Sequence, residues 1–242
     1  MVEAPLLGRR VVVTRPRDQA GNLVEQLEQL GAVVTVVPLI AIEPGDDSPR
    51  LAAALTEVDR YDWIVFTSAN GAEAVRRLDT SLDGVRVAAV GPATAAAVRG
   101  LGVEPSFVPE RFAGEEIATG LEPLGGARIL LPQADVADSG LAEELRRRGA
   151  TVDAIPAYRT VEVERTPSEL AELRAADAVV LASGSAARSL ASQGGAGAAL
   201  VLCIGPKTAE IAGEAGLPVG LIAHKATAEG IIQALVAHWE DS

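Results

Sequence analysis

The chain contains two copies of one pattern of strands, loops and helices. Residues 62–72 have a counterpart at 177–187, and residues 87–95 have one at 200–209. In each copy an apolar run stops at small or hydroxylated residues, and a helical pattern follows. This order is typical of parallel sheets, in which small residues form the loops at the carboxyl ends of the strands. Two such units suggest a cleft between two similar lobes.

The alternation of apolar runs and helical spacing predicts five strands in each copy. The strands are expected at 10–14, 33–38, 63–67, 85–90 and 106–108, and again at 128–131, 151–156, 178–182, 200–204 and 219–223. The helices between them are expected at 22–30, 73–78, 93–101, 115–121, 139–148, 186–191, 208–215 and 228–238. Each copy therefore reads as a flavodoxin-like, doubly wound α/β unit.

Two extended stretches lie at equivalent places, between the second and third strands of each copy. They are residues 39–42 and 158–163, with apolar or β-branched side chains at alternate positions. Such segments can pair as a two-stranded ribbon that crosses between lobes. The residues alone allow two wirings. In one, each repeat folds by itself; in the other, the first two strands of the copies are exchanged and one lobe contains both chain ends.

Composition excludes several classes of protein. The 242 residues carry a formal net charge of −12, which disfavours nucleic acid as a partner. The single cysteine, Cys203, excludes a disulfide framework and lies in an apolar run, so a buried inert thiol is expected. His224 and His238 lack paired ligand spacing, so no metal site is expected. With no signal peptide or membrane span in view, we expect a soluble, cytoplasmic protein with no membrane partner.

Four loops follow strands and open helices, at residues 67–71, 91–94, 183–185 and 205–208. Backbone amides at a helix N-terminus, together with hydroxyl groups, can bind an anion. Helix capping alone also explains Ser, Thr and Asn at any one such loop. Four equivalent loops at the carboxyl edges of two sheets favour binding. None has the sequence of a phosphate-binding loop, which disfavours a nucleotide ligand.

The sequence offers few catalytic groups. No nucleophile-elbow pattern, carboxylate pair or metal-ligand set is present. Tyr158 follows Pro156 at a strand end, and its phenol could donate a proton inside a cleft. Alternatively, Tyr158 packs at the junction of the lobes with its hydroxyl in water. Tyr61 precedes a strand and reads as structural.

Five short motifs, in this order and spacing, resemble the uroporphyrinogen-III synthase family over nearly the whole chain, from about Leu7 to Leu235. They are residues 13–16 (VTRP), 66–71 (FTSANG), 90–94 (VGPAT), 156–160 (PAYRT) and 204–208 (IGPKT). The resemblance implies the exchanged wiring. Residues 1–38 with 162–242 would form lobe one, residues 43–156 lobe two, and residues 39–42 and 157–161 the connecting ribbon.

The resemblance also implies the reaction. The family closes hydroxymethylbilane, a linear tetrapyrrole, to uroporphyrinogen III with inversion of ring D through a spiro intermediate, and uses no cofactor or metal. Tyr158 matches the tyrosine that helps the substrate hydroxyl leave. The implied partners are this substrate and, transiently, the upstream hydroxymethylbilane synthase, and the chain is expected to be a monomer. The implied substrate-binding residues are Thr14, Arg15, Ser68, Ala69, Asn70, Gly91, Thr94, Gln133, Ser183, Gly184, Ser185, Gly205, Lys207 and Thr208.

The chain departs from the family pattern at two places. Gln133 stands where relatives often have Arg, and Leu181-Ala182 replaces the Phe-Thr of the second copy's Phe-Thr-Ser motif. The competing hypothesis is a non-enzymatic, two-lobed module that binds or responds to a small ligand. Incubation with hydroxymethylbilane, followed by separation of the type I and type III isomers, discriminates the two hypotheses.

Overall fold

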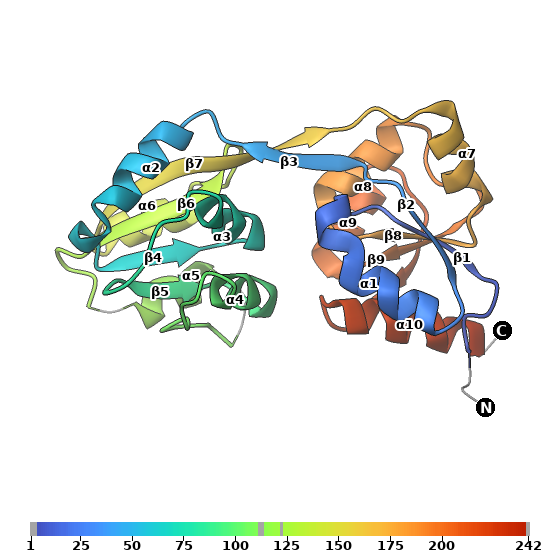
Figure 1. Ribbon diagram of the computed structural model, residues 1–242, viewed down its shortest axis with the longest axis horizontal. Helices are drawn as coiled ribbons and strands as arrows, with labels where there is room; N and C mark the ends of the chain where they lie inside the picture. Colours follow the sequence, from blue (N-terminus) through green and yellow to red (C-terminus); the bar gives the residue numbers. More distant parts are fainter. Residues whose placement is uncertain (1–3, 111–113, 122, 241–242) are drawn as a thin grey trace. The chain divides into compact units, whose positions relative to one another are not determined.

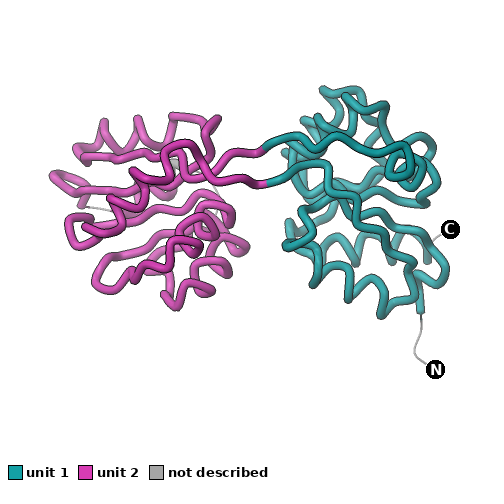
Figure 2. The backbone as a smooth tube through the Cα atoms, turned by 45° about the horizontal axis from the view of Figure 1, so that its top comes forward, with its two compact units in different colours: residues 1–41, 161–242 teal, residues 42–160 magenta. Residues whose placement is uncertain are grey.

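The computed structural model describes residues 4–110, 114–121 and 123–240, which form two compact units (Figure 2). Unit 1 consists of Met1–Ala41 together with Val161–Ser242, and unit 2 of Ile42–Thr160. Each unit contains one five-stranded sheet (Figure 1). The strands pair mainly in parallel, so the predicted α/β class with parallel sheets is confirmed.

Unit 1 has the strand order β10-β9-β8-β1-β2. Its strands are β1 (Arg10–Val13), β2 (Val33–Val36), β8 (Ala178–Leu181), β9 (Leu200–Cys203) and β10 (Val219–Ile222). Its helices are α1 (Arg17–Gln29), α7 (Pro167–Ala175), α8 (Gly184–Ser192), α9 (Pro206–Glu214) and α10 (Ala228–Glu240). Strand β1 pairs with β2 on one side and with β8, the central strand, on the other.

Helices cover both faces of the sheet in unit 1. Val11 and Val13 of β1 pack into the cluster that contains the apolar faces of α1 and α10. Val12, between them, packs into the cluster that contains α7, α8 and α9. Because successive side chains of a strand point to opposite faces, a run of valines supplies both cores. This explains why the central strands of this unit read as continuous apolar runs.

Unit 2 has the strand order β3-β7-β6-β4-β5. Its strands are β3 (Ile40–Pro44), β4 (Trp63–Phe66), β5 (Arg86–Ala89), β6 (Arg128–Ala134) and β7 (Thr151–Glu162). Its helices are α2 (Ser48–Thr56), the 3₁₀ turn η1 (Val58–Arg60), α3 (Ala69–Arg76), α4 (Pro92–Arg99), α5 (Gly114–Gly120) and α6 (Gly140–Arg147). The first two residues of β3 and the last two of β7 belong to unit 1.

The same two-sided burial operates in unit 2. Ile64 and Phe66 of β4 pack into the cluster with α2, α3 and α4. Trp63 and Val65 pack into the cluster with α5 and α6. All four side chains are at most 5% exposed. Each buried side chain of this size contributes about 1.5–3 kcal/mol to stability, so both faces of the sheet are anchored.

A reciprocal pair of hydrogen bonds joins two strands at the amino end of each sheet. In unit 1 the Arg10 amide donates to the Asp177 carboxylate at 2.7 Å, and the Asp177 amide donates to the Arg10 carbonyl at 2.8 Å. In unit 2 the Arg128 amide donates to the Asp62 carboxylate at 2.8 Å, and the Asp62 amide donates to the Arg128 carbonyl at 2.8 Å. The pairs fix the register of β1 against β8 and of β6 against β4.

The two segments that connect the units pair with each other. The Gly45 amide donates to the Ala157 carbonyl and the Val163 amide to the Leu39 carbonyl, both at 3.1 Å. Residue numbers rise along one segment, from 39 to 45, while those of the paired residues fall, from 163 to 157. The two segments are therefore antiparallel. A side chain at Gly45 would collide with the carbonyl oxygen of Pro156. Gly45 is therefore required by the close approach of the two backbones.

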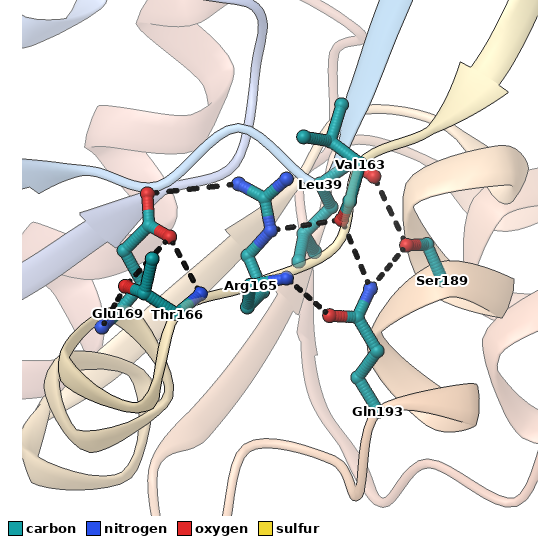
Figure 3. A network of polar contacts seen from close by, with 7 residues as sticks. All are labelled: Leu39, Val163, Arg165, Thr166, Glu169, Ser189 and Gln193. Carbon is teal, nitrogen blue, oxygen red and sulfur yellow. Dashed lines mark hydrogen bonds and ion pairs between the residues drawn. The ribbon is translucent and has the colours of Figure 1, made fainter.

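A buried polar network fixes both connecting segments to α8 within unit 1 (Figure 3). The Ser189 hydroxyl donates to the Leu39 carbonyl at 3.0 Å and accepts from the Gln193 amide group at 2.9 Å. Gln193 also donates to the Val163 carbonyl at 3.3 Å and accepts from the Arg165 backbone amide at 3.2 Å. The Arg165 guanidinium, 2% exposed, donates to the same Val163 carbonyl at 2.9 Å. The carbonyl groups of Leu39 and Val163 in the connecting segments therefore have hydrogen-bond partners within the protein and need none from water.

Some sequence predictions differ from the structure. The expected strand at 106–108 is reduced to one isolated bridge between Ala88 and Phe107. Helix α1 begins at Arg17, five residues before the expected start, because Pro16 precedes the helix and does not interrupt it. Helices α2 and α7 were not predicted, although both begin next to a proline. The strand expected to end at Pro156 and the extended stretch expected at 158–163 form one strand, β7, which ends at Glu162.

We predict that Ser189→Ala lowers the free energy of unfolding by about 1–3 kcal/mol, because it leaves the Leu39 carbonyl and the Gln193 amide group without this partner. Ser192→Ala is the control, since its hydroxyl donates only to a carbonyl of its own helix, that of Ser189. It should change the same quantity by less than about 0.5 kcal/mol. Urea denaturation of both variants measures the difference. Equal destabilisation would contradict an anchoring role for the network.

Candidate functional site

The carboxyl ends of the parallel strands place the sequence-predicted residues at one edge of each sheet. In unit 2 this edge carries Ser68 after β4, Gly91 after β5 and Gln133 within the end of β6. In unit 1 it carries Ser183 after β8 and Gly205 after β9. Open α/β sheets bind their ligands at this edge. The structure therefore collects the predicted residues into two sets, one in each unit.

The serine loops are capped in the same way in both units. The Ser68 hydroxyl accepts a hydrogen bond from the Gly71 amide at 3.1 Å, and the Ser183 hydroxyl accepts one from the Ala186 amide at 3.1 Å. These bonds satisfy one free amide at the start of α3 and of α8. Asn70, Gly184 and Ser185 in the same loops are partly exposed. Helix capping therefore explains why a serine stands at both positions. The capacity of these loops to bind an anion comes from the neighbouring amides and side chains.

The glycine-proline loops leave the first amides of their helices without a side-chain cap. Gly91 and Gly205 are the N-cap residues of α4 and α9, and neither helix receives a side-chain cap. Thr94 and Thr208, three residues later, are only 7% and 8% exposed. Lys207 is exposed beside Thr208. An uncapped helix N-terminus attracts anions through its amides and the helix dipole, so these loops suit carboxylates.

Tyr158 has the most distinctive environment among the predicted residues. Its phenol is hydrogen-bonded to the Ser68 hydroxyl at 2.8 Å, and the residue is 7% exposed. The pairing of β6 with β7 slips at this point: Gln133 pairs with Pro156 but Ala134 pairs with Tyr158. Ala157 is the extra residue and forms a bulge. As a result Ala157 and Tyr158, which are adjacent in the strand, both pack into the core cluster that contains residues of α2 and α3. The bulge aims the phenol at the loop after β4.

The electrostatics of this position keep Tyr158 protonated. Burial raises the pKa of the phenol, and the nearby carboxylate of Asp135 raises it further. Hydrogen bonds with Ser68 and Asn70 lower the pKa of the phenol but do not outweigh burial. At neutral pH the group is therefore a neutral hydroxyl, able to donate a proton or a hydrogen bond. Sequence reasoning missed Asp135, which lies in the turn after β6 with its amide bonded to the Tyr158 carbonyl.

Thr14 and Arg15 follow β1 in unit 1. Thr14 is fully buried, and its hydroxyl donates to the Val180 carbonyl at 2.7 Å, so its side chain links two strands. Arg15 is half-buried, and desolvation lowers the pKa of its guanidinium, which nonetheless stays charged. No salt bridge or side-chain hydrogen bond joins Arg15 to another residue that the structure describes. A partly desolvated cation of this kind suits a carboxylate ligand.

The other singled-out residues have structural roles. Tyr61 donates its hydroxyl to Asp153 at 2.7 Å, and burial together with this carboxylate raises its pKa to about 12. Burial raises the pKa of the Cys203 thiol to about 11.

Within the described ranges no group of three or more His, Cys, Asp or Glu side chains is placed to hold a metal ion. Nor is any helix of those ranges long and apolar enough to cross a membrane.

Comparison with known proteins decides the family. The family model for uroporphyrinogen-III synthase HemD matches residues 21–233. The chain belongs to the uroporphyrinogen-III synthase family. The resemblance carried by the five motifs is thereby confirmed.

Individual relatives agree with this assignment. The chain is 32% identical over 168 residues to the porphyrin biosynthesis protein HemD of Ruminiclostridium josui, a match that covers 66% of this chain and 33% of that protein. It is 32% identical over 249 residues to the chloroplastic uroporphyrinogen-III synthase of Oryza sativa, covering 94% of this chain and 81% of the other. The chain thus spans a third of the first relative.

A solved structure shows the same fold. A mutant uroporphyrinogen III synthase from the extremely thermophilic bacterium Thermus thermophilus superposes with a TM-score of 0.64 at 17% identity, covering 97% of this chain and all of the other. At this identity the similarity establishes the fold alone.

We predict that Cys203 does not react with an aromatic disulfide reagent at pH 8 in the folded protein. With a thiol pKa of about 11, only about one molecule in a thousand carries a thiolate at that pH, and the side chain is fully buried. Denaturant should release one equivalent of thiol, since the sequence contains one cysteine. Rapid reaction in native buffer would contradict the buried, inert assignment.

Proposed function

We propose that this chain catalyses the cyclisation of hydroxymethylbilane to uroporphyrinogen III, with inversion of ring D, in tetrapyrrole biosynthesis. The observation that carries the proposal is the protonated, buried phenol of Tyr158, held against Ser68 at the carboxyl edge of the unit 2 sheet. Family membership supplies the reaction class. The geometry supplies a single well-placed proton donor, which is what a dehydrating cyclisation requires.

In the proposed reaction Tyr158 gives its proton to the substrate hydroxyl as the carbon–oxygen bond breaks and water leaves. The remaining azafulvene is electrophilic, and the substituted carbon of ring D attacks it to form the spiro intermediate. That intermediate fragments and recloses with ring D inverted, and the proton released on closure restores the phenol. The net change is loss of water with no oxidation or reduction, so we propose that no redox cofactor or metal takes part. The chief task of the protein is to hold the chain so that inversion precedes direct closure.

We propose that the substrate carboxylates bind to the loops at the carboxyl edges of both sheets. The uncapped amides after Gly91 and Gly205 suit carboxylates without requiring lysines. Arg15 and Lys207 add positive charge in unit 1, and Gln133 offers a neutral amide in unit 2. Ala69, Asn70, Gly184 and Ser185 complete the serine loops. The net charge of −12 makes long-range attraction of an anionic substrate weak, so local donors must supply the affinity.

We further propose that units 1 and 2 are the two lobes of a flavodoxin-like pair, with the first two strands exchanged between the sequence repeats. The pairing of β1 with β8 and of β6 with β4 supports this wiring. The paired segments β3 and β7 support a two-stranded ribbon as the connection. A monomeric state, a cytoplasmic location and a transient encounter with hydroxymethylbilane synthase remain parts of the proposal.

The direct test is incubation of the protein with freshly prepared hydroxymethylbilane, followed by oxidation and chromatographic separation of the type I and type III isomers. The proposal predicts mainly the type III isomer, whereas spontaneous closure gives type I. An isomer ratio equal to that of the buffer control would exclude the activity and favour a non-enzymatic module that binds a small ligand.

We predict that Tyr158→Phe lowers the initial rate by about 10²–10⁴-fold, because it removes the proton donor and keeps the ring. Tyr61→Phe is a matched control: it removes the other tyrosine hydroxyl, which bonds to Asp153, and should lower stability without lowering the rate comparably. Ser68→Ala and Thr208→Val should reduce the rate less than Tyr158→Phe, since the adjacent amides remain. Initial rate and type III fraction are the readouts. A Tyr158→Phe variant with near wild-type values in both would remove Tyr158 from the mechanism.

A further inference from the structure

A pocket of about 210 Å³ opens beside Tyr158, entirely within unit 2. Its walls come from β3, the start of α2, one side of α3 with the residues just after it, and the middle of β7. Apolar groups supply much of the lining: Ile42, Pro44, Leu51, Ala74, Leu78 and Ala157. An apolar cavity of about 150 Å³ holds a benzene molecule, so this pocket has room for one substituted five-membered ring. Sequence reasoning did not find it, because α2 was not predicted.

The pocket touches the candidate catalytic group. Tyr158 and Asn70 both line it, and Tyr158 bonds to Ser68 at the base of α3. A ring that enters the pocket therefore lies next to the phenol that we propose as the proton donor. Pockets that combine an apolar lining with a few convergent polar groups are the usual form of small-molecule sites.

The charges at the pocket favour an anionic substituent. Its two acidic lining residues are already paired: Glu73 accepts from Arg76 at 2.6 and 2.7 Å, and Glu43 accepts from Arg159 at 2.7 and 2.9 Å. Asp46 also lies 3.5 Å from Arg159, but its side chain is 91% exposed and is screened by solvent.

Arg77 is the remaining charged lining residue, and its guanidinium has donors to spare. Within the described residues its side chain makes one long hydrogen bond, from Nε to Glu73 at 3.4 Å, an acceptor that Arg76 already holds more closely. Its side chain is 40% exposed, so the terminal nitrogens can reach a ligand at the rim. A planar guanidinium with two such nitrogens matches a carboxylate in two parallel hydrogen bonds.

We propose that this pocket receives one pyrrole ring of the substrate, with a carboxylate side chain of that ring on Arg77. The inference rests on the proposed function and extends it to a specific subsite. The substrate, hydroxymethylbilane, carries eight carboxylates on its four pyrrole rings, which is two on each ring. Each ring therefore offers an apolar body with anionic substituents. Contact with Tyr158 assigns the pocket to the ring that carries the leaving hydroxyl. Seating that ring would place the breaking carbon–oxygen bond at the phenol.

The first test compares two arginines, Arg77 just after α3 and Arg99 at the end of α4. Arg77→Gln should raise KM for hydroxymethylbilane about 3- to 10-fold, as expected for one partly exposed ion pair with a carboxylate. Arg99→Gln removes the same charge from the end of another helix of the same unit, but Arg99 is paired with Glu104 and neither residue lines the pocket. It should leave KM within about twofold. Equal effects of the two substitutions would overturn the assignment of Arg77.

The second test fills the pocket. Ala74→Leu places three further carbons in it and should lower kcat/KM at least about tenfold. Ala97→Leu makes the same change at a half-buried alanine that packs against the same core from α4, outside the pocket. Thermal unfolding of both variants checks that they fold. A folded Ala74→Leu variant as active as Ala97→Leu would overturn the proposal.

A binding experiment separates this inference from the proposed reaction. A monocyclic pyrrole with two carboxyalkyl side chains, added at millimolar concentration, should shift the methyl NMR signals of Leu51 and Leu78 in the wild-type protein. The shifts should weaken in Arg77→Gln and persist in Arg99→Gln. Such shifts in a protein that fails to convert hydroxymethylbilane would retain the ligand class and reject the reaction. Turnover to the type III isomer without any shift at these methyl groups would reject the pocket and retain the reaction.

Discussion

The reciprocal hydrogen bonds between an arginine backbone and an aspartate, Arg10 with Asp177 and Arg128 with Asp62, set the register on which both sheets depend. They lie at the amino ends of the central strands, where two strands from distant parts of the chain must meet in parallel. Once β1 is aligned with β8 and β6 with β4, the remaining strands add at the sides. Unit 1 then requires both ends of the chain, whereas unit 2 is built from one continuous segment.

The positions of the functional groups follow from that register. Parallel alignment brings the carboxyl ends of the strands to one edge, so each sheet presents its loops together. Strands β4 and β8 each end two residues before a serine at this edge. Ser68 and Ser183 therefore cap the helices that follow in the same way. The bulge at Ala157 then breaks the symmetry between the units. It turns Tyr158 toward Ser68 and gives unit 2 a protonated phenol, to which no described residue corresponds at the serine loop of unit 1.

The sequence predicted the features that depend on local pattern. Apolar runs located nine of the strands, seven of them to within two residues at each end, because a doubly covered sheet buries the residues of its central strands. Strands β6 and β7 extend three and six residues beyond their expected ends. Prolines caused most of the errors in boundaries. Pro92 and Pro206 were placed in the loops before the helices and are the first residues of α4 and α9, while Pro156 was read as a strand end and lies inside β7.

Features that depend on distant contacts were beyond a reading of the sequence. The bulge at Ala157 arises from a slip against β6 and has no signal in residues 151–162 themselves. The buried state of Thr14 reflects its bond to Val180, which is 166 residues away. The pocket beside Tyr158 exists only because α2 and β3 pack against α3, and nothing in the local sequence singles out its Arg77.

The central proposal is that the carboxyl-edge loops of each unit bind carboxylates of the tetrapyrrole. Hydrogen–deuterium exchange with and without the product, uroporphyrinogen III, measures this most directly at the backbone amides of the non-proline residues in 68–71, 91–94, 183–186 and 205–208. The account predicts slower exchange in the loops of both units when the product is present, with helix α1 unchanged as an internal reference. Protection confined to one unit, or absent from all four loops at saturating product, would contradict it.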